Sequence, residues 1–230
     1  KALAVTTQKP EQIRALTGLV KNILKGKENA LGNVTVLITG IPNVGKSTII
    51  NILAGKQIAK TGNEPAITKG QQCINLNNGI LLYDTPGILW PKIENVPSGY
   101  RLAATGAIKE TAMSADDVAV FTVGFLMKAY PEQMKARYRL DPLPESEIDF
   151  LEIIGRQRGC LGSGGHVDFH KLATIILQEL RNIVIGRISM ETPAMIEEEL
   201  VIVEQKRAEK EAKEAAKKKK KVGDQPRFRD

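Results

Sequence analysis

Several features that would restrict the class of this 230-residue sequence are scarce or missing. It has only two cysteines, Cys73 and Cys160, which cannot form a disulfide framework and favour a reducing compartment. The longest apolar run, residues 118–127, is too short to span a bilayer, and the N-terminus shows no secretory signal. No internal repeat is visible. We therefore expect a cytoplasmic protein that acts as a monomer, with no membrane association.

Positive charge, in contrast, is in excess. The formal net charge is +7, and hydrophobic residues make up 42% of the chain, which is ordinary for a globular protein with a sizeable core. A basic balance indicates an anionic partner, most often nucleic acid. It is weak evidence alone, because many basic proteins bind no such partner.

The first hundred residues predict alternating strands and helices. Apolar runs predict strands at 2–7 (ALAVTT) and 34–39 (VTVLIT), helical spacing predicts helices at 11–24 and 47–53, and a turn at 77–79 predicts a hairpin of 73–76 with 80–83. Pro10 suits the first helical position. This order indicates an α/β domain of the P-loop NTPase type with a parallel-rich sheet.

Beyond this region helical periods dominate. We expect helices at 99–109, 114–128, 131–139, 146–156 and 168–185. The predicted division is a nucleotide-binding portion at 1–97, a small helical domain at 98–192 and a charged tail at 193–230. In the tail, Glu and Lys at i, i+4 spacing support a solvated helix, and we expect 223–230 to be disordered.

The strongest motif is GIPNVGKST, residues 40–48, which fits G-x-x-x-x-G-K-[ST] between a predicted strand and a predicted helix. Gly40 and Gly45 allow backbone N–H groups to approach phosphate oxygens, and the following helix points its positive end at the anion. Lys46 can reach the β- and γ-phosphates, and Ser47 can bind Mg²⁺. The alternative, an accidental glycine-rich turn, explains the flanking elements poorly.

Two further segments suit this loop. Asp84 ends an apolar strand and can hold Mg²⁺ through water, and Gly87 of the same DTPG sequence can offer its N–H to a γ-phosphate. Read alone, DTPG could be a plain turn. Thr68 lies between the two motifs and could close over Mg²⁺ and the γ-phosphate, although a lone loop threonine usually has no such role.

Together, the segments GIPNVGKSTIIN, TGNEPAITKGQQ and DTPGILWPK resemble the RbgA/YlqF family of circularly permuted GTPases, which act in assembly of the large ribosomal subunit. The segments RLAATGAIKETA, RGCLGSGG and GRISMETP resemble the helical C-terminal domain of that family. The resemblance covers roughly residues 1 to 195 and leaves out the lysine-rich tail.

The resemblance implies that the guanine-reading elements precede the phosphate loop, with Thr6 and Thr7 nearest the base. The other guanine element, an Asn-Lys-x-Asp motif, is absent from the sequence. Its aspartate would pair with the guanine ring, and a site without that partner discriminates poorly against ATP. We therefore expect that the chain lacks the N-terminal part of the family's domain.

The resemblance also bears on hydrolysis. Ras-like proteins place a water-orienting Gln after DTPG, but Ile88 stands here, as the family leads one to expect. Intrinsic hydrolysis should then be slow and stimulated by the ribosome, a monovalent cation or another residue. Asn43 matches the family's asparagine that helps to hold K⁺ near the β/γ bridge. Alternatively, Asn43 merely suits the turn.

Other features are weaker. Cys160, His166, Asp168 and His170 lack good zinc spacing, and Asp168 more simply caps the next helix. Trp90 could contact rRNA or pack internally, and packing is the simpler interpretation. Residues 156–165 are Gly-rich and basic and are the better candidate for specific rRNA contact. The lysines at 217–221 could bind RNA phosphates nonspecifically or could simply be solvated.

The sequence therefore predicts a GTP-binding and GTP-hydrolysing switch that acts in late large-subunit assembly, with the subunit precursor and rRNA as partners. Two alternatives stay open: an RNA-binding module with a structural nucleotide, and an ATPase. The predicted catalytic residues are Lys46, Thr68 and Gly87. The predicted Mg²⁺ ligands are Ser47, Thr68 and Asp84, and the predicted K⁺ ligand is Asn43. The predicted nucleotide-binding residues are Thr6, Thr7, Asn43, Val44, Gly45, Lys46, Ser47, Thr48 and Gly87.

Overall fold

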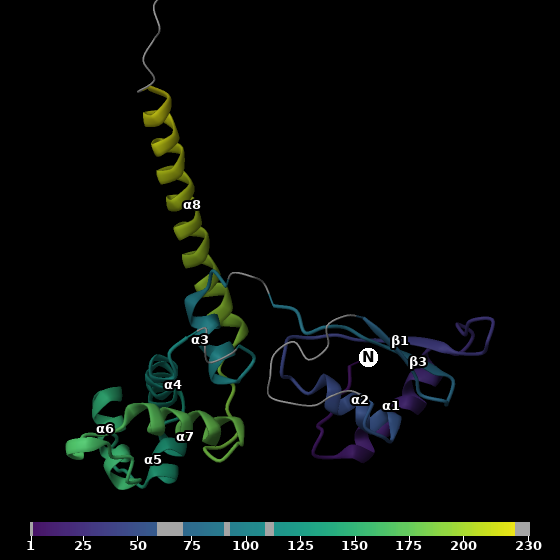
Figure 1. Ribbon diagram of the computed structural model, residues 1–230, viewed down its shortest axis with the longest axis horizontal. Coiled ribbons are helices and arrows are strands. Elements are labelled where there is room, and N and C mark those ends of the chain that lie inside the picture. The colour runs from purple at the N-terminus through teal and green to yellow at the C-terminus, as the bar shows by residue number, and fades with distance from the viewer. Residues whose placement is uncertain (1, 59–70, 90–92, 109–112, 224–230) are drawn as a thin grey trace, which may run out of the picture.

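The structure, a computed structural model, describes residues 2–58, 71–89, 93–108 and 113–223, with side chains as far as Glu214. It has a sheet part and a helical part that lie side by side, with a long final helix leaving the helical part (Figure 1). Thr68, Trp90 and residues 224–230, about which the sequence made predictions, lie outside the described residues.

The sheet part is a small mixed sheet with helices on one side. In order along the chain its elements are α1 (Pro10–Ile23), β1 (Val34–Ile38), α2 (Lys46–Ala54), β2 (Gln72–Asn75) and β3 (Ile80–Asp84). The strand order is β1-β3-β2. β1 pairs with β3 in parallel and β2 pairs with β3 antiparallel, so the α/β prediction and the predicted hairpin are confirmed.

One predicted strand is wrong. Residues 2–6 form neither a helix nor a strand, and the described strands β1, β2 and β3 pair only with one another. Apolar composition alone does not make a strand, because a strand also needs a neighbour for its backbone hydrogen bonds. Leu3 within this run is 61% exposed, so the run is not buried either.

The core of the sheet part is compact and one-sided. Ile50 of α2, Ile74 of β2 and Leu82 of β3 are buried together, and both α1 and α2 lie on the same side of the sheet (Figure 1). Leu37, whose neighbours Val36 and Ile38 are more buried, is 57% exposed. Alternation along β1 therefore buries one face of that strand and leaves the other accessible.

The helical part holds the larger core. Its helices are α3 (Val96–Ala104), α4 (Ala115–Ala129), α5 (Pro131–Tyr138), α6 (Glu147–Gln157) and α7 (Phe169–Arg181). Leu126, Phe150, Ile154, Leu172 and Ile176 are among its fully buried side chains. α4 is the central helix, packing against α3, α5, α6 and α7.

Two details of this part depend on individual residues. Asp168 caps α7 by accepting a hydrogen bond from the Lys171 backbone N–H at 3.0 Å, as the sequence predicted. The prediction that this helix reaches residue 185 is wrong, because it ends at Arg181 and Ile183 adopts a left-handed conformation with φ 61°. Glycine is the usual residue in such a C-terminal position.

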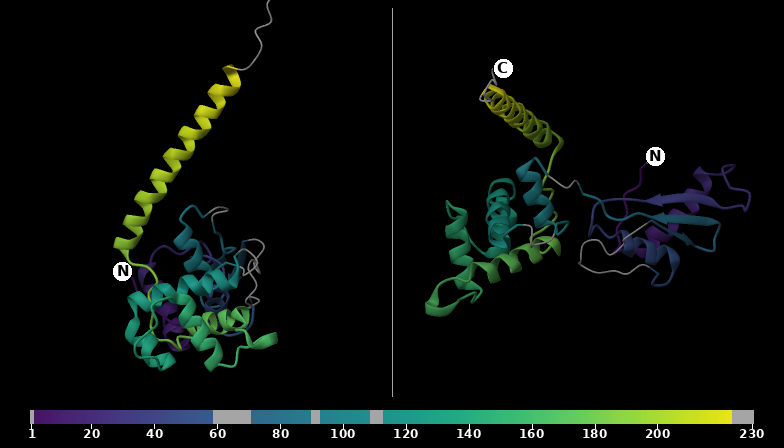
Figure 2. Two further views of the ribbon diagram at one scale, coloured as in Figure 1. Left: turned by 90° about the vertical axis from the view of Figure 1, so that its left-hand side faces the viewer. Right: turned by 45° about the horizontal axis from the view of Figure 1, so that its top comes forward.

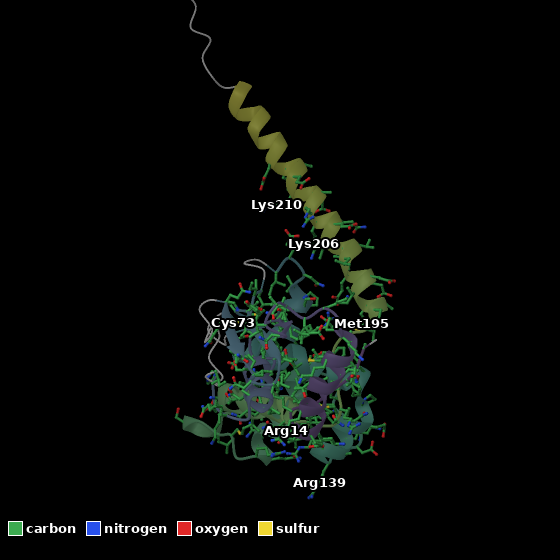
Figure 3. All side chains as sticks on the ribbon, turned by 90° about the vertical axis from the view of Figure 1, so that its right-hand side faces the viewer. Arg14, Cys73, Arg139, Met195, Lys206 and Lys210 are labelled. Atoms are coloured by element: carbon green, nitrogen blue, oxygen red, sulfur yellow. The ribbon has the colours of Figure 1, made fainter. Side chains whose placement is uncertain are left out.

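The final helix, α8 (Pro193–Gly223), projects away from both parts in every view (Figure 2). Its base is fixed by Arg101 of α3, which is 5% exposed and donates to Glu199 through both terminal nitrogens, at 2.8 and 2.5 Å. Farther out along α8, Lys206 and Lys210 (Figure 3) line a shallow groove with Ile93, Glu94 and Val96. In the part of the chain that the structure describes, no helix is both long and apolar enough to cross a membrane.

Candidate functional site

Two loops meet at one edge of the sheet because β1 and β3 are parallel neighbours. Ile38, the last residue of β1, lies opposite Asp84, the last residue of β3. The phosphate loop follows β1 and the DTPG turn follows β3, so both begin at the carboxyl edge, where α/β sheets bind ligands. Thr85 fixes this arrangement: its N–H and its hydroxyl both donate to the Ile38 carbonyl, at 3.3 and 3.0 Å.

The phosphate loop has the backbone that its motif predicts. Gly45 is the N-cap of α2 with φ 89°, and Asn43 has φ 56°. Positive φ is easy for glycine, and asparagine tolerates it better than most residues. These conformations place the start of α2 directly after the loop, so the helix N-terminus can face a bound anion.

Lys46 lies over the loop that precedes it. Its Nζ donates to the carbonyls of Gly40 and Ile41, at 3.1 and 2.7 Å. Burial lowers the pKa of Lys46 from its ordinary value, and the negative charge of Asp84 partly offsets that effect. The ammonium group and the Asp84 carboxylate therefore face the same small region between the two loops.

The DTPG turn packs directly on the phosphate loop. A Cβ built on Gly87 would lie 2.7 Å from Pro42 Cα and 3.1 Å from Lys46 Nζ. Only glycine allows this approach, because the backbone of Pro42 cannot move aside as a flexible side chain could. Asp84 is 1% exposed at the end of β3, and its carboxylate oxygens are the ligand type that Mg²⁺ prefers.

The remaining predicted residues lie around this centre. Ser47 is in the first turn of α2, and Thr48 lines a shallow groove with Arg14 and Asn51. Val44 is 51% exposed in the loop. The Thr7 methyl group lies 3.9 Å from where a Cβ of Gly45 would be. Thr6 makes local contacts: its side chain accepts from the Gln8 N–H and its carbonyl from the Lys9 N–H.

One contact at this site was missed by sequence reasoning. The Asn43 side chain donates to the Gly106 carbonyl of the helical part at 2.8 Å, across 63 positions of sequence. The sequence singled out both residues for other reasons, Asn43 as a cation ligand and Gly106 within a family segment. No local pattern could show that the two meet.

Ile88, the residue at the position of the Ras-like glutamine, is 71% exposed. Its alkyl side chain can neither donate nor accept a hydrogen bond. Within the described residues, no group of three or more His, Cys, Asp and Glu side chains is placed to hold a metal ion.

Comparison with known proteins agrees with this geometry. The family model described as "50S ribosome-binding GTPase" matches residues 35–143. A Ribosome biogenesis GTPase A from Priestia megaterium is 44% identical over 207 residues, covering 86% of this chain and 72% of the relative. A protein of the same name from Bacillus cereus is 41% identical over 211 residues, covering 89% and 71%.

Solved structures of YlqF also match. A GDP-bound structure aligns with a TM-score of 0.53 and 28% identity, over 76% of this chain and 66% of that one. A GNP-bound structure from T. maritima aligns with a TM-score of 0.50, also at 28% identity, over 75% and 65%. By the extent and identity of these matches, this chain belongs to the ribosome biogenesis GTPase A family.

Proposed function

We propose that the chain binds and hydrolyses GTP as a switch in late assembly of the large ribosomal subunit. The observation that carries the proposal is the direct packing of the DTPG turn on the phosphate loop, with Gly87 against Pro42. A turn in this place can detect whether a γ-phosphate is present, because the phosphate must fit beside it. Family membership supports guanine as the base.

Each residue of the centre has a role in this proposal. Lys46 and the backbone N–H groups of the loop from Asn43 to Thr48 hold the phosphates, while the Gly87 N–H binds the γ-phosphate. Thr68 closes over the triphosphate only. Thr7, with Thr6 beside it, lies toward the base. Hydrolysis releases the contacts of Thr68 and Gly87, and the protein then leaves its partner.

We propose that Mg²⁺ is held by oxygen donors of the phosphate loop, the DTPG turn and Thr68. The hydroxyl of Ser47 follows the loop, and the buried carboxylate of Asp84 lies close enough to Lys46 to shift its pKa. With Thr68, these groups supply oxygen ligands, and the ion would neutralise charge on the β- and γ-phosphates.

Asn43 fits a K⁺ role for a similar reason. Its amide oxygen is a ligand type that a cation can use, and the residue lies in the phosphate loop. K⁺ held there would supply positive charge near the β/γ bridge, where other GTPases use an arginine. Because Ile88 cannot orient water, we propose that intrinsic hydrolysis is slow and that K⁺ and the ribosome accelerate it.

The partner in this proposal is the large-subunit precursor with its rRNA. Arg156 and the Gly-rich segment that follows it are exposed on the helical part and offer charge to RNA phosphates. The α8 helix adds lysines farther out. We propose a cytoplasmic monomer divided near residues 97 and 192, since one core is formed by residues 50–82 and the others by residues 103–190.

Phosphate release tests the proposal. The full chain is mixed with GTP or ATP, in K⁺ or Na⁺, with and without large ribosomal subunits. We expect GTP turnover that rises with the subunits and in K⁺. Nucleotide binding without turnover under any condition would favour an RNA-binding module with a structural nucleotide. Equal use of ATP would favour an ATPase.

A further inference from the structure

The phosphate loop is tied to the helical part through one side chain. Asn43 Nδ2 donates to the carbonyl of Gly106, which follows α3, with an N···O distance of 2.8 Å. A carbonyl only accepts, so the amide nitrogen must face it. Asn43 is also the non-glycine residue of this loop with a left-handed backbone, at φ 56°. Such a conformation is unfavourable outside glycine and benefits from an external contact.

The position of Gly106 is in turn set by Arg181, the last residue of α7. Arg181 Nε donates to the Ala104 carbonyl at 2.9 Å, and Nη2 donates to the Ala103 carbonyl at 3.0 Å. These carbonyls belong to the last turn of α3, and the Ala103 carbonyl also accepts from the Gly106 N–H at 3.0 Å, so the arginine and Gly106 meet at the same carbonyl. The guanidinium also packs on Gly106, where a Cβ would lie 3.4 Å from Arg181 Nε.

The backbone at Gly106 suits this packing. Its φ is 80°, a conformation that a side chain would strain, and its missing Cβ leaves the space that the guanidinium occupies. Arg181, the end of α3, Gly106 and Asn43 therefore form one continuous chain of contacts. It runs from the C-terminal end of α7 to the phosphate loop.

We propose that Arg181 is a positioning residue for the nucleotide site. By fixing the end of α3 it holds the Gly106 carbonyl against Asn43, so the conformation of the phosphate loop and the orientation of the helical part depend on each other. The inference rests on nucleotide binding by this loop. Coupling of this kind is reciprocal: if the link helps the loop to bind nucleotide, bound nucleotide strengthens the link.

Nucleotide affinity provides the first test. Binding of a fluorescent GDP is titrated for the full chain and for Arg181→Ala, Asn43→Ala and the double variant. We expect each single variant to bind about fivefold more weakly, the effect of one hydrogen bond, and the double variant to bind no more weakly than Asn43→Ala alone. Arg187→Ala, a change at an exposed arginine of the same segment, is the matched control and should bind as the unaltered chain does.

Two results would overturn the link. One is unchanged GDP affinity in a folded Arg181→Ala variant, and the other is a double variant whose loss equals the two single losses combined. A purely structural role for Arg181 would lower the melting temperature without this non-additivity. If Arg181→Ala does not fold, Arg181→Lys keeps a cation and one donor, and we expect an intermediate loss of affinity.

The second test measures the orientation directly. Cys73 is exposed on β2 and Cys160 is buried, so a label on Cys73 and another on Gln157→Cys report the distance between the two parts. We expect GDP to narrow the distance distribution of the otherwise unaltered chain, and we expect Asn43→Ala and Arg181→Ala to abolish that response. If GDP leaves the distance distribution of the unaltered chain unchanged, the coupling is contradicted. Absence of GDP binding by that chain would overturn both this inference and the proposed function, whereas binding without any effect of Arg181→Ala overturns the link only.

Discussion

The sheet part and the helical part differ in what holds them together. In the sheet part, the main core cluster has three buried members around Ile50, and the nucleotide-facing loops lie at its edge. In the helical part, the main cluster has twelve buried members, and ion pairs to the buried Glu179 tie its helices together. The difference teaches that function and stability are concentrated in different halves. We expect the half with the smaller core to gain stability when nucleotide binds, because a ligand stabilises the state it binds.

The ionic network of the helical part is centred on Glu179 of α7. This carboxylate is 8% exposed and accepts hydrogen bonds from Arg137 and from the Tyr138 hydroxyl, and it pairs with Arg158 at 3.1 Å. Burial alone would raise the pKa of Glu179. The hydrogen bonds from Arg137 and Tyr138, together with the charges of Arg158 and Arg137, more than offset it and leave the pKa below its usual value.

The largest effect should come from removing this charge. Glu179→Gln should lower the free energy of unfolding by about 2 kcal/mol, because it leaves the buried Tyr138 hydroxyl and two partly exposed arginines without their anion. Urea unfolding followed by circular dichroism measures the change. The control is Glu152→Gln, whose pair with Arg156 is exposed and should contribute at most about 0.5 kcal/mol. Equal losses of unfolding free energy in the two variants would mean that Glu179 stabilises the helical part no more than an exposed ion pair does.

The same residue predicts a pH dependence. A carboxyl whose folded pKa is depressed contributes stability above its unfolded pKa and loses that contribution as the pH falls through the folded pKa. We therefore expect the unaltered chain to lose stability on acidification below about pH 4.5 more steeply than Glu179→Gln does. Parallel pH profiles would contradict this assignment.

Lys46→Ala tests the nucleotide site of the sheet part. It should weaken GDP binding about 100-fold, because a preorganised cation facing the phosphates is lost. The unfolding of the helical part should not change. Lys56→Ala, an exposed lysine just after α2, is the control and should bind GDP normally. If the helical part lost stability in Lys46→Ala, the two halves would be less independent than their cores suggest.

Gly87→Ala should weaken binding of GTP more than binding of GDP. Its methyl group would meet the Pro42 backbone at 2.7 Å, which pushes the turn away from the loop. We expect affinity for a non-hydrolysable GTP analogue to fall about tenfold, since a hydrogen bond to a charged oxygen is lost, while affinity for GDP falls less. Gly18→Ala meets no atom within 4 Å and is the control. Equal losses for both nucleotides would show that Gly87 does not sense the γ-phosphate.

The smallest effect should be a gain in stability. Ile183 is β-branched, is 51% exposed and has φ 61° after the end of α7. Ile183→Gly should stabilise the helical part by about 1 kcal/mol by relieving this strain, as thermal unfolding would show. At the neighbouring Val184, which is also exposed, a change to glycine should destabilise slightly. If both glycine variants were less stable than the unaltered chain, the packing of the Ile183 side chain would outweigh its backbone strain.

The phosphate loop, the DTPG turn and most helices could be predicted from sequence because their determinants are local. Gly45 and Lys46 mark the start of α2, Asp168 caps α7, and the turn at 77–79 sets the hairpin register. The family assignment also came from such local segments. The prediction was wrong at residues 2–6, at 105–108, where α3 ends at Ala104 although the predicted helix reached 109, and beyond Arg181. The outcome depended on a pairing neighbour in the first case and on left-handed backbone at Gly106 and Ile183 in the other two.

The predicted chemistry of the nucleotide site follows from the local sequence, because phosphate binding needs particular residues at short, fixed spacing. Packing of the sheet and the helices brings distant groups together: Gly87 meets Pro42, Arg101 meets Glu199, and Asn43 meets the Gly106 carbonyl. Such contacts join residues tens of positions apart through backbone atoms or single side chains. They leave no periodic signal in the chain, because their geometry arises only when the sheet and the helices have packed.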